Sequence, residues 1–372
     1  MSTTSPKTAI IGFGSSDISR RTSKGITTLA VEAVKDALVQ ANLSAADIDG
    51  FVGAPWATNV DAVHADGADE ISWRPLAKAC GFTNIRFGVD HFRGYATDMV
   101  ATAAMALVAN ECRYIIGVRA LYNIQGIENE SSHGARQAYG NEQFITPFGY
   151  SVAGARFATR ARRYMELNGI TREDLYEITA LARRHAARNP YAIWKEKSVR
   201  LDDYMTAPMV ADPHCLYDCD MPVCGAAAFV IARSGDIPHG AVSAPVLSWS
   251  NHLNPEAVFK EAGLKPSDID LCQLYDGFST MIPEWLEAFG WCETGKSLDF
   301  IKDGKAELDG TLPLNTFGGS LGEGRLHGIG HLREAYLQVS GQADERQLSN
   351  ANRCLVQIGP FDSSSFVLLG HH

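Results

Sequence analysis

The stretch Ala41-Asn-Leu-Ser-Ala-Ala-Asp47-Ile48-Asp49 returns late in the chain as Ala262-Gly-Leu-Lys-Pro-Ser-Asp268-Ile269-Asp270. In both copies a helical pattern leads into the stretch, and a short apolar run with strand character follows it. A second pair, Arg113-Tyr-Ile-Ile-Gly117 and Arg353-Cys-Leu-Val-Gln-Ile-Gly359, occurs beyond each copy. Similarity at so long a spacing indicates an internal duplication and not a solenoid, whose repeats are far shorter.

Between these stretches, apolar runs alternate with segments of helical periodicity. The predicted strands are Thr8–Phe13, Gly50–Gly53, Ile85–Val89, Tyr114–Val118 and Cys224–Arg233, and the predicted helices are Thr27–Ala41 and Tyr95–Asn110. Such alternation is typical of layered α/β proteins.

The middle of the chain, about residues 120–213, differs in character from both halves. Gly, Asn, Gln and aromatic residues run to Tyr150, and basic stretches with helical character follow. We therefore predict a first half over residues 1–240 that carries this segment as an insertion, and a second half over residues 241–372. The turn-forming residues of Ser234–Ala244 are predicted to link the two halves.

Charge and hydropathy exclude some classes of partner. The 372 residues include 33 Lys and Arg against 43 Asp and Glu, which gives a formal net charge of −10. This charge repels nucleic acid and anionic lipid surfaces, so we expect binding to neither. The N-terminus lacks the apolar core of a secretion signal, and no later stretch is long and apolar enough to span a bilayer. A cytoplasmic protein is therefore expected.

Eight cysteines are scattered along the chain without the spacing of a disulfide framework. The densest group is Cys215, Cys219 and Cys224, beside His214, and its spacings of four and five match no paired zinc knuckle. We interpret these residues as buried thiols and predict no metal site, with structural zinc as the alternative.

Three stretches carry a resemblance to a known family. They are Tyr217-Asp-Cys-Asp-Met-Pro-Val-Cys-Gly225-Ala-Ala, Leu274-Tyr275-Asp276-Gly-Phe278-Ser, and Leu314-Asn315-Thr-Phe-Gly318-Gly319-Ser-Leu-Gly-Glu-Gly324-Arg325-Leu-His327-Gly328. Together with the duplication and the insertion, they resemble the thiolase superfamily, and within it the sterol carrier protein X-type thiolases and the lipid-transfer-protein retro-aldolases that cleave steroid side chains. The resemblance implies a duplicated five-layer αβαβα thiolase fold. It also implies an acyl-CoA thioester substrate, with CoA as part of the substrate and no separate cofactor.

The chain departs from the thiolase pattern at each catalytic position. Thiolases attack with a cysteine at the start of a helix in the first half, where the dipole favours the thiolate, but Val89-Asp-His91-Phe-Arg-Gly94-Tyr95 contains none. Arg325 occupies the histidine position of the family's Gly-His-Pro loop, and the late cysteine is absent from Gln357–Ser365. These departures predict chemistry without a covalent acyl-enzyme.

The retro-aldolases imply what chemistry remains, because cleavage of a β-hydroxyacyl-CoA needs only proton transfer and an oxyanion hole. The resemblance assigns the proton transfer to Tyr275, whose alternative is a packed core tyrosine. Arg325 stands where that family has a second tyrosine, and we predict that it binds an oxygen of the substrate, with an ion pair to Glu323 or to an acidic residue of the insertion as the alternative. His327 and His91 are candidate acid–base groups, with structural roles as the alternative.

Neighbouring positions are predicted to support these groups. Asp276 and Asn315 would orient them or a water molecule, and Gly318 and Gly319 would supply backbone amides close to the thioester. Cations are also needed for the CoA phosphates in an acidic protein, and we predict them in the insertion. The candidates there are Arg160, Arg163 and Arg184. The aromatic stretch Phe144–Tyr150 is a candidate lining of the acyl pocket, with aromatic core packing as the alternative.

Two other functions stay open. One is an acyltransferase or Claisen-type enzyme in which Cys80, Cys219 or Cys224 is a displaced nucleophile. The other is a non-catalytic CoA- or lipid-binding subunit of a complex. The resemblance further implies a homodimer, with the small-residue helix after Gly94 as a candidate interface, and a partner protein with an OB fold and a zinc ribbon that helps to bind acyl-CoA.

Overall fold

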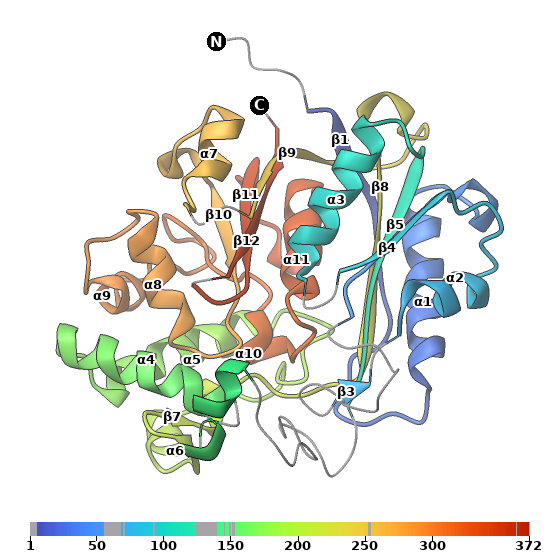
Figure 1. The fold of residues 1–372 in the computed structure, drawn as a ribbon. Helices are drawn as coiled ribbons and strands as arrows, with labels where there is room; N and C mark the ends of the chain where they lie inside the picture. Colours follow the sequence, from blue (N-terminus) through green and yellow to red (C-terminus); the bar gives the residue numbers. More distant parts are fainter. Residues whose placement is uncertain are drawn as a thin grey trace.

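The computed structural model describes residues 6–55, 68–69, 71–91, 94–123, 140–144, 146–148, 150, 153–251, 254–361 and 363–371 (Figure 1). Its main sheet has two similar parts, ordered β1-β8-β5-β2-β4 and β9-β12-β11-β10, which join where β1 pairs with β9. The strands are β1 Thr8–Ser15, β2 Gly50–Gly53, β4 Phe87–Asp90, β5 Tyr114–Asn123, β8 Gly225–Arg233, β9 Ala244–Ser250, β10 Leu271–Leu274, β11 Arg353–Ile358 and β12 Ser365–Gly370. The short strand β3, Ala68–Asp69, pairs with β5, and β6, Met209–Ala211, pairs with β7, His214–Cys215.

The two parts of the sheet repeat one topology. β1 pairs antiparallel with β8, β8 antiparallel with β5, and β5 parallel with β2. In the second part β9, β12, β11 and β10 pair in the same succession of directions. The predicted duplication is therefore present in the strand order.

Two aspartates in each copy of the repeated stretch explain why it is recognisable in the sequence. The carboxylates of Asp47 and Asp268 each accept a hydrogen bond, at 2.8 Å, from the amide three residues earlier, which closes the turns η1, Ala45–Asp47, and η7, Pro266–Asp268. Asp49 then accepts the amide of Arg113 at the start of β5, and Asp270 accepts that of Arg353 at the start of β11, both at 2.9 Å. In each half, the two repeated stretches therefore contact each other, and these hydrogen bonds join neighbouring strands.

The helices complete five layers, which Figure 1 shows side by side. α1 and α2 cover the outer face of the first part, α3 and α11 lie between the two parts, and α7, α8 and α9 cover the outer face of the second. Their bounds are α1 Ile26–Gln40, α2 Trp73–Ala79, α3 Ala96–Val108, α7 Ala257–Ala262, α8 Met281–Ala288, α9 Ser297–Lys302 and α11 Ile329–Val339. The predicted αβαβα fold is confirmed.

Small residues allow α1 to lie directly on the sheet. A Cβ atom on Gly12 would lie 2.5 Å from the carbonyl oxygen of Ala37, and one on Gly14 would lie 2.3 Å from that of Ala33. No larger side chain fits there without moving the helix. Among the described helices, none has both the length and the apolar character required to cross a bilayer.

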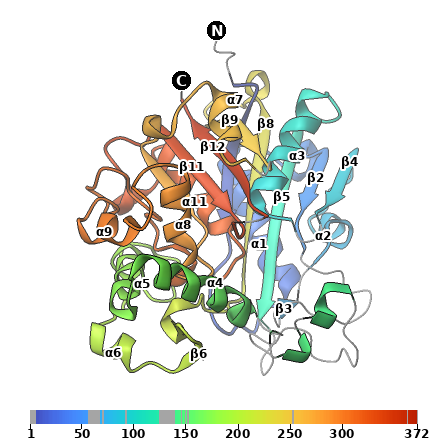
Figure 2. The same ribbon diagram turned by 60° about the vertical axis from the view of Figure 1, so that its left-hand side comes forward.

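The segment predicted as an insertion packs against the second half of the chain, although it interrupts the first (Figure 2). Met165, Leu175 and Ile178 share a buried cluster with Trp285 and Leu298. The segment contains α4 Ala153–Asn168, α5 Arg172–Ala186 and α6 Leu201–Met205. Besides η1 and η7, the short turns in the described residues are η3 Gly140–Phe144, η4 Thr146–Phe148, η5 Leu216–Asp218, η6 Ser234–Asp236 and η8 Asp344–Arg346.

Candidate active site

Tyr275 lies directly after β10, at the carboxyl ends of the parallel strands β10 and β11, where open α/β sheets commonly bind ligands. Its amide donates to the main-chain oxygen of Gln357 at 3.1 Å, which ties it to the end of β11. Its half-buried ring lies 5.7 Å from that of His331, between centroids, and packs over Gly277, where a Cβ atom would lie 3.0 Å from the phenol oxygen.

Asp276 organises the chain beneath Tyr275. Its buried carboxylate accepts the amide of Ser320 at 2.7 Å, and Nε2 of His331 lies 3.0 Å from the same oxygen. Ser320 belongs to the first turn of α10, Gly319–Glu323, so the carboxylate caps this short helix. Asp276 thus orients neighbouring groups of the chain and holds α10 and α11 together.

His327 is buried and adopts a left-handed conformation with φ 48°. Its Nδ1 atom meets the guanidinium of Arg119, which reaches it from β5 in the other half of the chain. Because arginine only donates, Nδ1 must accept, and the proton of the neutral ring remains on Nε2. Burial and the charges of Arg119 and Arg325 lower the pKa of His327 well below its usual value. The neutral ring is therefore a donor through Nε2.

His91 lies directly after β4, at the corresponding end of the first part of the sheet. Its carbonyl accepts the amide of Gly94 at 3.0 Å, and Gly94 in turn accepts from Arg119 at 3.3 Å. Burial lowers the pKa of His91, while Asp98 opposes this shift, and its buried Nε2 has no hydrogen-bond partner in the part of the chain that the structure describes. The ring therefore presents an unused imidazole nitrogen.

Arg325 is half-buried, two residues before His327. Its amide donates to the carbonyl of Met221 at 2.8 Å, which joins the loop to the segment before β8. The carboxylate of Glu323, the alternative partner expected for Arg325, forms an ion pair with Arg333 and accepts from Asn189 at 2.8 Å.

The supporting residues act mainly within the chain. Asn315 accepts from the amide of Leu274 and donates to its carbonyl, both at 2.8 Å, and so clamps the end of β10. The amide of Gly318 donates to the carbonyl of Asn315 at 2.8 Å. A Cβ atom on Gly319 would lie 2.0 Å from the carboxylate of Asp276, so the glycine allows this contact. The structure thus explains Asn315, Gly318 and Gly319 by their packing, independently of a thioester.

The three arginines predicted for CoA phosphates do not form one cluster with a common partner. Arg160 on α4 donates to Glu284 at 2.7 Å, and Arg184 on α5 donates to Glu307 at 2.6 Å. Arg163 is exposed. Two of these three cations are therefore already matched by carboxylates.

The aromatic stretch before α4 does not line a pocket where the structure describes it. Phe144 and Phe148 are 69% and 74% exposed, which contradicts both the acyl-pocket lining and the core packing expected for them. Ile145 and Gly149 lie outside the described residues.

The cysteines considered as displaced nucleophiles are poor ones. Burial raises the pKa of Cys80 to about 11 and is also the main cause that raises the pKa of Cys219 and Cys224. Thiols of this kind stay protonated at neutral pH and do not attack acyl carbonyls efficiently. Cys215 and Cys224 belong to different core clusters, and no group of three possible metal ligands occurs within the described residues.

Sequence reasoning missed Arg119 and His331. Arg119 is the charged residue within the otherwise apolar run of β5, and His331, on α11, follows His327 by four residues in the sequence. Both patterns are visible in the sequence, but the first contact spans the two halves of the chain. Contacts among Gly94, Arg119 and His327 connect the chain beside His91 to the loop that precedes α11. On α11 itself, the ring of His331 lies next to that of Tyr275.

Comparisons with known proteins identify the family of the chain. Residues 252–370 match the family described as thiolase C-terminal domain-like. The chain is 30% identical to the 17-hydroxy-3-oxo-4-pregnene-20-carboxyl-CoA lyase of Mycobacterium tuberculosis, over 98% of this chain and 100% of that protein. It is also 30% identical to a steroid side-chain-cleaving aldolase of Thermomonospora curvata, over 97% of each protein.

Solved structures give the same picture. An Ltp2–ChsH2(DUF35) aldolase superposes with a TM-score of 0.86 at 29% identity, over 99% of both chains. The acetyl-CoA acetyltransferase of Syntrophomonas wolfei superposes with a TM-score of 0.69 at 15% identity, over 98% of this chain and 99% of that one, which shows a shared fold. Since two relatives are 30% identical over nearly the whole chain, this protein belongs to the thiolase superfamily, in the family of the steroid side-chain-cleaving aldolases.

Proposed function

We propose that this protein catalyses retro-aldol cleavage of a β-hydroxyacyl-CoA whose acyl group carries a steroid nucleus. The observation that carries the proposal is its near full-length relation to two proteins named as a steroid carboxyl-CoA lyase and a steroid side-chain-cleaving aldolase. The raised pKa values of Cys80, Cys219 and Cys224 support a route without a covalent acyl-enzyme.

The reaction requires two proton transfers and one site for negative charge. A base takes the proton of the β-hydroxyl, and the O–H electron pair forms the new carbonyl bond. The bond between Cα and Cβ breaks, and its electron pair passes to the thioester as an enolate. A proton then returns to Cα, so the products are a ketone and a shortened acyl-CoA.

The described residues suit these roles. Tyr275 transfers protons at the end of β10, where Gln357 and the rings packed around it hold it in place. His91 is the partner acid or base, because its Nε2 is not used by another described group. His327 donates its Nε2 proton to the thioester oxygen as negative charge develops, and Arg325 adds a positive charge nearby.

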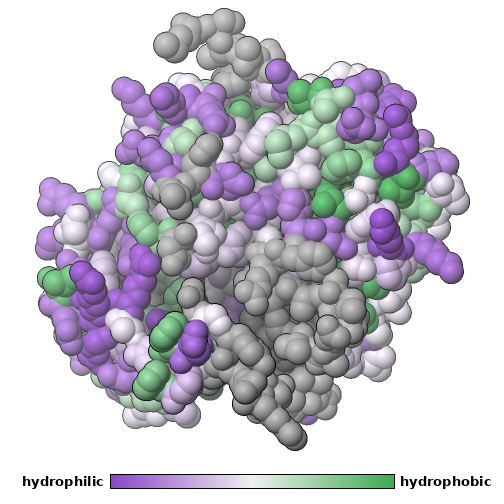
Figure 3. Space-filling view, viewed as in Figure 1, coloured by the Kyte–Doolittle hydropathy of each residue, from purple (hydrophilic) through white to green (hydrophobic). Residues whose placement is uncertain are grey.

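The enzyme works with partners. The solved relative is an aldolase named for two proteins, Ltp2 and the DUF35 protein ChsH2, and we propose a partner of the DUF35 type, with an OB fold and a zinc ribbon, for this chain. We also propose a homodimer. Met105 and Val108 on α3 are 53% and 47% exposed, and Figure 3 shows hydrophobic residues over this part of the surface, which makes α3 a candidate interface.

The test is ketone release from a CoA thioester of a steroid acid with a tertiary β-hydroxyl, measured with and without a DUF35 partner. We expect Tyr275→Phe to lower kcat by about 10²-fold or more, the usual loss of a general acid–base group. The control is Tyr176→Phe, which loses a hydrogen bond to the carbonyl of Val199 in the inserted segment and should keep kcat within about twofold. An unchanged kcat in Tyr275→Phe would remove this residue from the mechanism.

The same samples separate the two other functions. Intact-mass spectrometry after exposure to acyl-CoA detects an acyl adduct if Cys80, Cys219 or Cys224 attacks the thioester, and that adduct would favour an acyltransferase. Full turnover by the assembled complex with a Tyr275→Phe and Arg325→Ala double variant would favour a non-catalytic subunit.

A further inference from the structure

Arg183, on α5, is a buried cation enclosed by aromatic rings. Its side chain is only 6% exposed, and its guanidinium carbon lies 3.9 Å from the ring centre of Trp194 and 5.7 Å from that of Tyr217. Lys197 adds a second positive charge, with its ammonium 5.7 Å from the ring centre of Trp194. Two cations thus share the Trp194 ring.

Main-chain groups of the two aromatic residues form hydrogen bonds that do not involve Arg183. The amide of Trp194 donates to the carbonyl of Gly322 in α10 at 3.3 Å. Thr179, one helical turn before Arg183, donates to the carbonyl of Tyr217 at 3.2 Å. The aromatic rings therefore do not depend on Arg183 for their position, and the site borders the helix that Asp276 caps.

Arg183 has no anionic partner among the described residues. Its Nε atom is buried without a hydrogen-bond partner, and burial lowers the pKa of the guanidinium to about 10. Asp218, the carboxylate nearest in sequence to Tyr217, is already bonded to Tyr204 at 2.7 Å and to Ser279 at 2.6 Å. A buried cation without a counterion is costly, so such a site favours an anion from outside the chain.

Two other arginines of the inserted segment differ from Arg183 in both exposure and pairing. Arg184 is exposed and paired with Glu307, and Arg160 is exposed and paired with Glu284. Both were predicted to bind CoA phosphates, whereas Arg183 was not. In a chain of net charge −10, a phosphate group requires a local cation that carboxylates have not already matched.

We propose that Arg183, Trp194, Tyr217 and Lys197 form a binding site for a phosphate group. The guanidinium presents forked donors to two phosphate oxygens, Lys197 neutralises further charge at the rim, and Trp194 forms one wall. A phosphate of the CoA group is the natural occupant, an assignment that rests on the proposed function, and free inorganic phosphate is the other source of the same chemistry.

Calorimetric titration of the full chain, without turnover, tests the site. The probes are CoA, 3′-dephospho-CoA, pyrophosphate and inorganic phosphate. We expect Arg183→Gln to weaken CoA binding by about tenfold or more, as for loss of charge-assisted hydrogen bonds. The matched control Arg188→Gln removes the same charge from an exposed position just beyond α5 and should change the Kd by about twofold or less.

The probes identify the source of the phosphate. Equal losses for CoA and 3′-dephospho-CoA assign the site to the diphosphate, and a loss for CoA alone assigns it to the 3′-phosphate. A loss for inorganic phosphate alone keeps the site but rejects CoA as its occupant. Equal affinities of Arg183→Gln and wild type for all four probes would overturn the inference.

A second measurement covers the case in which Arg183→Gln does not fold. Pyrophosphate should change the tryptophan fluorescence of the wild type, and Trp194→Phe should abolish that change. An identical change in Trp194→Phe would contradict the site. Neither experiment involves catalysis, so failure of the wild type to cleave its substrate would reject the proposed lyase and leave the phosphate site standing.

Discussion

At the scale of single residues, the contact between His327 and Arg119 decides what His327 can do. A histidine of ordinary pKa is a flexible acid or base near neutral pH. Here burial, Arg119 and Arg325 hold the pKa of His327 well below its usual value, and the guanidinium occupies Nδ1. The ring is left as a neutral donor, which suits stabilisation of an oxyanion better than proton abstraction.

Arg119→Gln should separate the two effects of Arg119 on His327. The amide of the introduced glutamine could still donate to Nδ1, but it would carry no charge, so the pKa of His327 should rise. We expect the acidic limb of the profile of kcat/KM against pH to move to higher pH, and kcat/KM to fall about tenfold or more. NMR titration of the imidazole measures the pKa directly, and an unaltered pKa in Arg119→Gln would contradict the assigned contact.

Histidines with lowered pKa also make stability depend on pH. His91, His214 and His327 bind a proton in the unfolded chain below about pH 6.5 but resist it when folded. Their contribution is therefore fully present above that pH and is lost as pH falls towards the folded pKa, by up to about 1.4 kcal/mol per pH unit for each group.

His327→Gln should accordingly flatten the fall in stability between about pH 6.5 and 5, by about the contribution of one proton. Urea unfolding at several pH values measures this slope. Above about pH 7.5 the three histidines are almost entirely neutral in both states, so the stability curves of wild type and variant should run parallel there. An equally steep acidic slope in His327→Gln would show that this group is not the source.

At the scale of elements, α10 depends on the carboxylate of Asp276. Gly319 begins the helix at φ 64°, a conformation that favours glycine, and faces this carboxylate directly. A short helix of this kind has little stability of its own, so the cap and the packing of Gly318 and Gly322 on α5 determine its place.

Gly319→Ala should destabilise the protein by about 2–4 kcal/mol, from left-handed strain together with overlap with Asp276. The matched control is Gly263→Ala, at φ 69° with open space around the new methyl group, which should cost about 1 kcal/mol for strain alone. Urea midpoints compare the two variants. Equal losses would mean that the carboxylate moves freely and does not hold α10.

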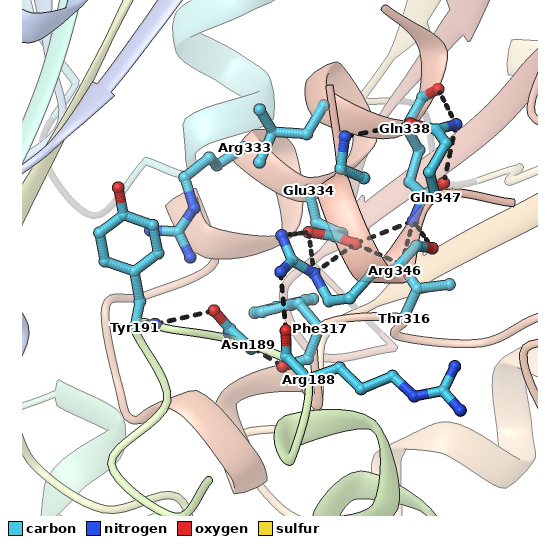
Figure 4. A network of polar contacts seen from close by, with 12 residues as sticks. Arg188, Asn189, Tyr191, Thr316, Phe317, Arg333, Glu334, Gln338, Arg346 and Gln347 are labelled. Carbon is cyan, nitrogen blue, oxygen red and sulfur yellow. Dashed lines mark hydrogen bonds and ion pairs between the residues drawn. The ribbon is translucent and has the colours of Figure 1, made fainter. Parts of the chain in front are cut away.

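At the scale of the whole molecule, α11 packs between the two parts of the main sheet, and a buried polar network joins it to the inserted segment (Figure 4). Glu334 on α11 pairs with Arg346 at 3.0 Å, with the two side chains 0% and 3% exposed. Arg346 also donates to the carbonyl of Arg188, just beyond α5, at 3.1 Å, and Thr316 donates to Glu334 at 2.7 Å. One carboxylate thus helps to hold three separate parts of the chain.

Glu334→Gln should therefore destabilise the protein by about 3–5 kcal/mol, because Arg346 is left buried without its counterion. The control is Asp299→Asn in the exposed pair of Lys296 and Asp299, which should leave the urea midpoint nearly unchanged. A small effect of Glu334→Gln would indicate that Arg346 readily finds another partner.

The bounds of some helices and strands were predicted closely from the sequence, and those of others were not. Gly50–Gly53 was predicted with the bounds of β2, and the predicted helix Thr27–Ala41 matches α1 within one residue at each end, since apolar periodicity is local. β5 extends to Asn123, five residues beyond the prediction, because pairing with β8 continues along it. α2 was not predicted, since a helix of this length leaves little periodic pattern.

The sequence by itself determined the duplicated α/β architecture and the likeness to acyl-CoA enzymes, because repeats, periodicity and motifs are properties of neighbouring residues. Only the tertiary structure decided which charged groups are matched. It joined Arg119 to His327 across the two halves, paired Arg184 with Glu307, and enclosed Arg183 between aromatic rings. Burial and ion pairing depend on residues that meet in space, and spacing along the chain does not specify them.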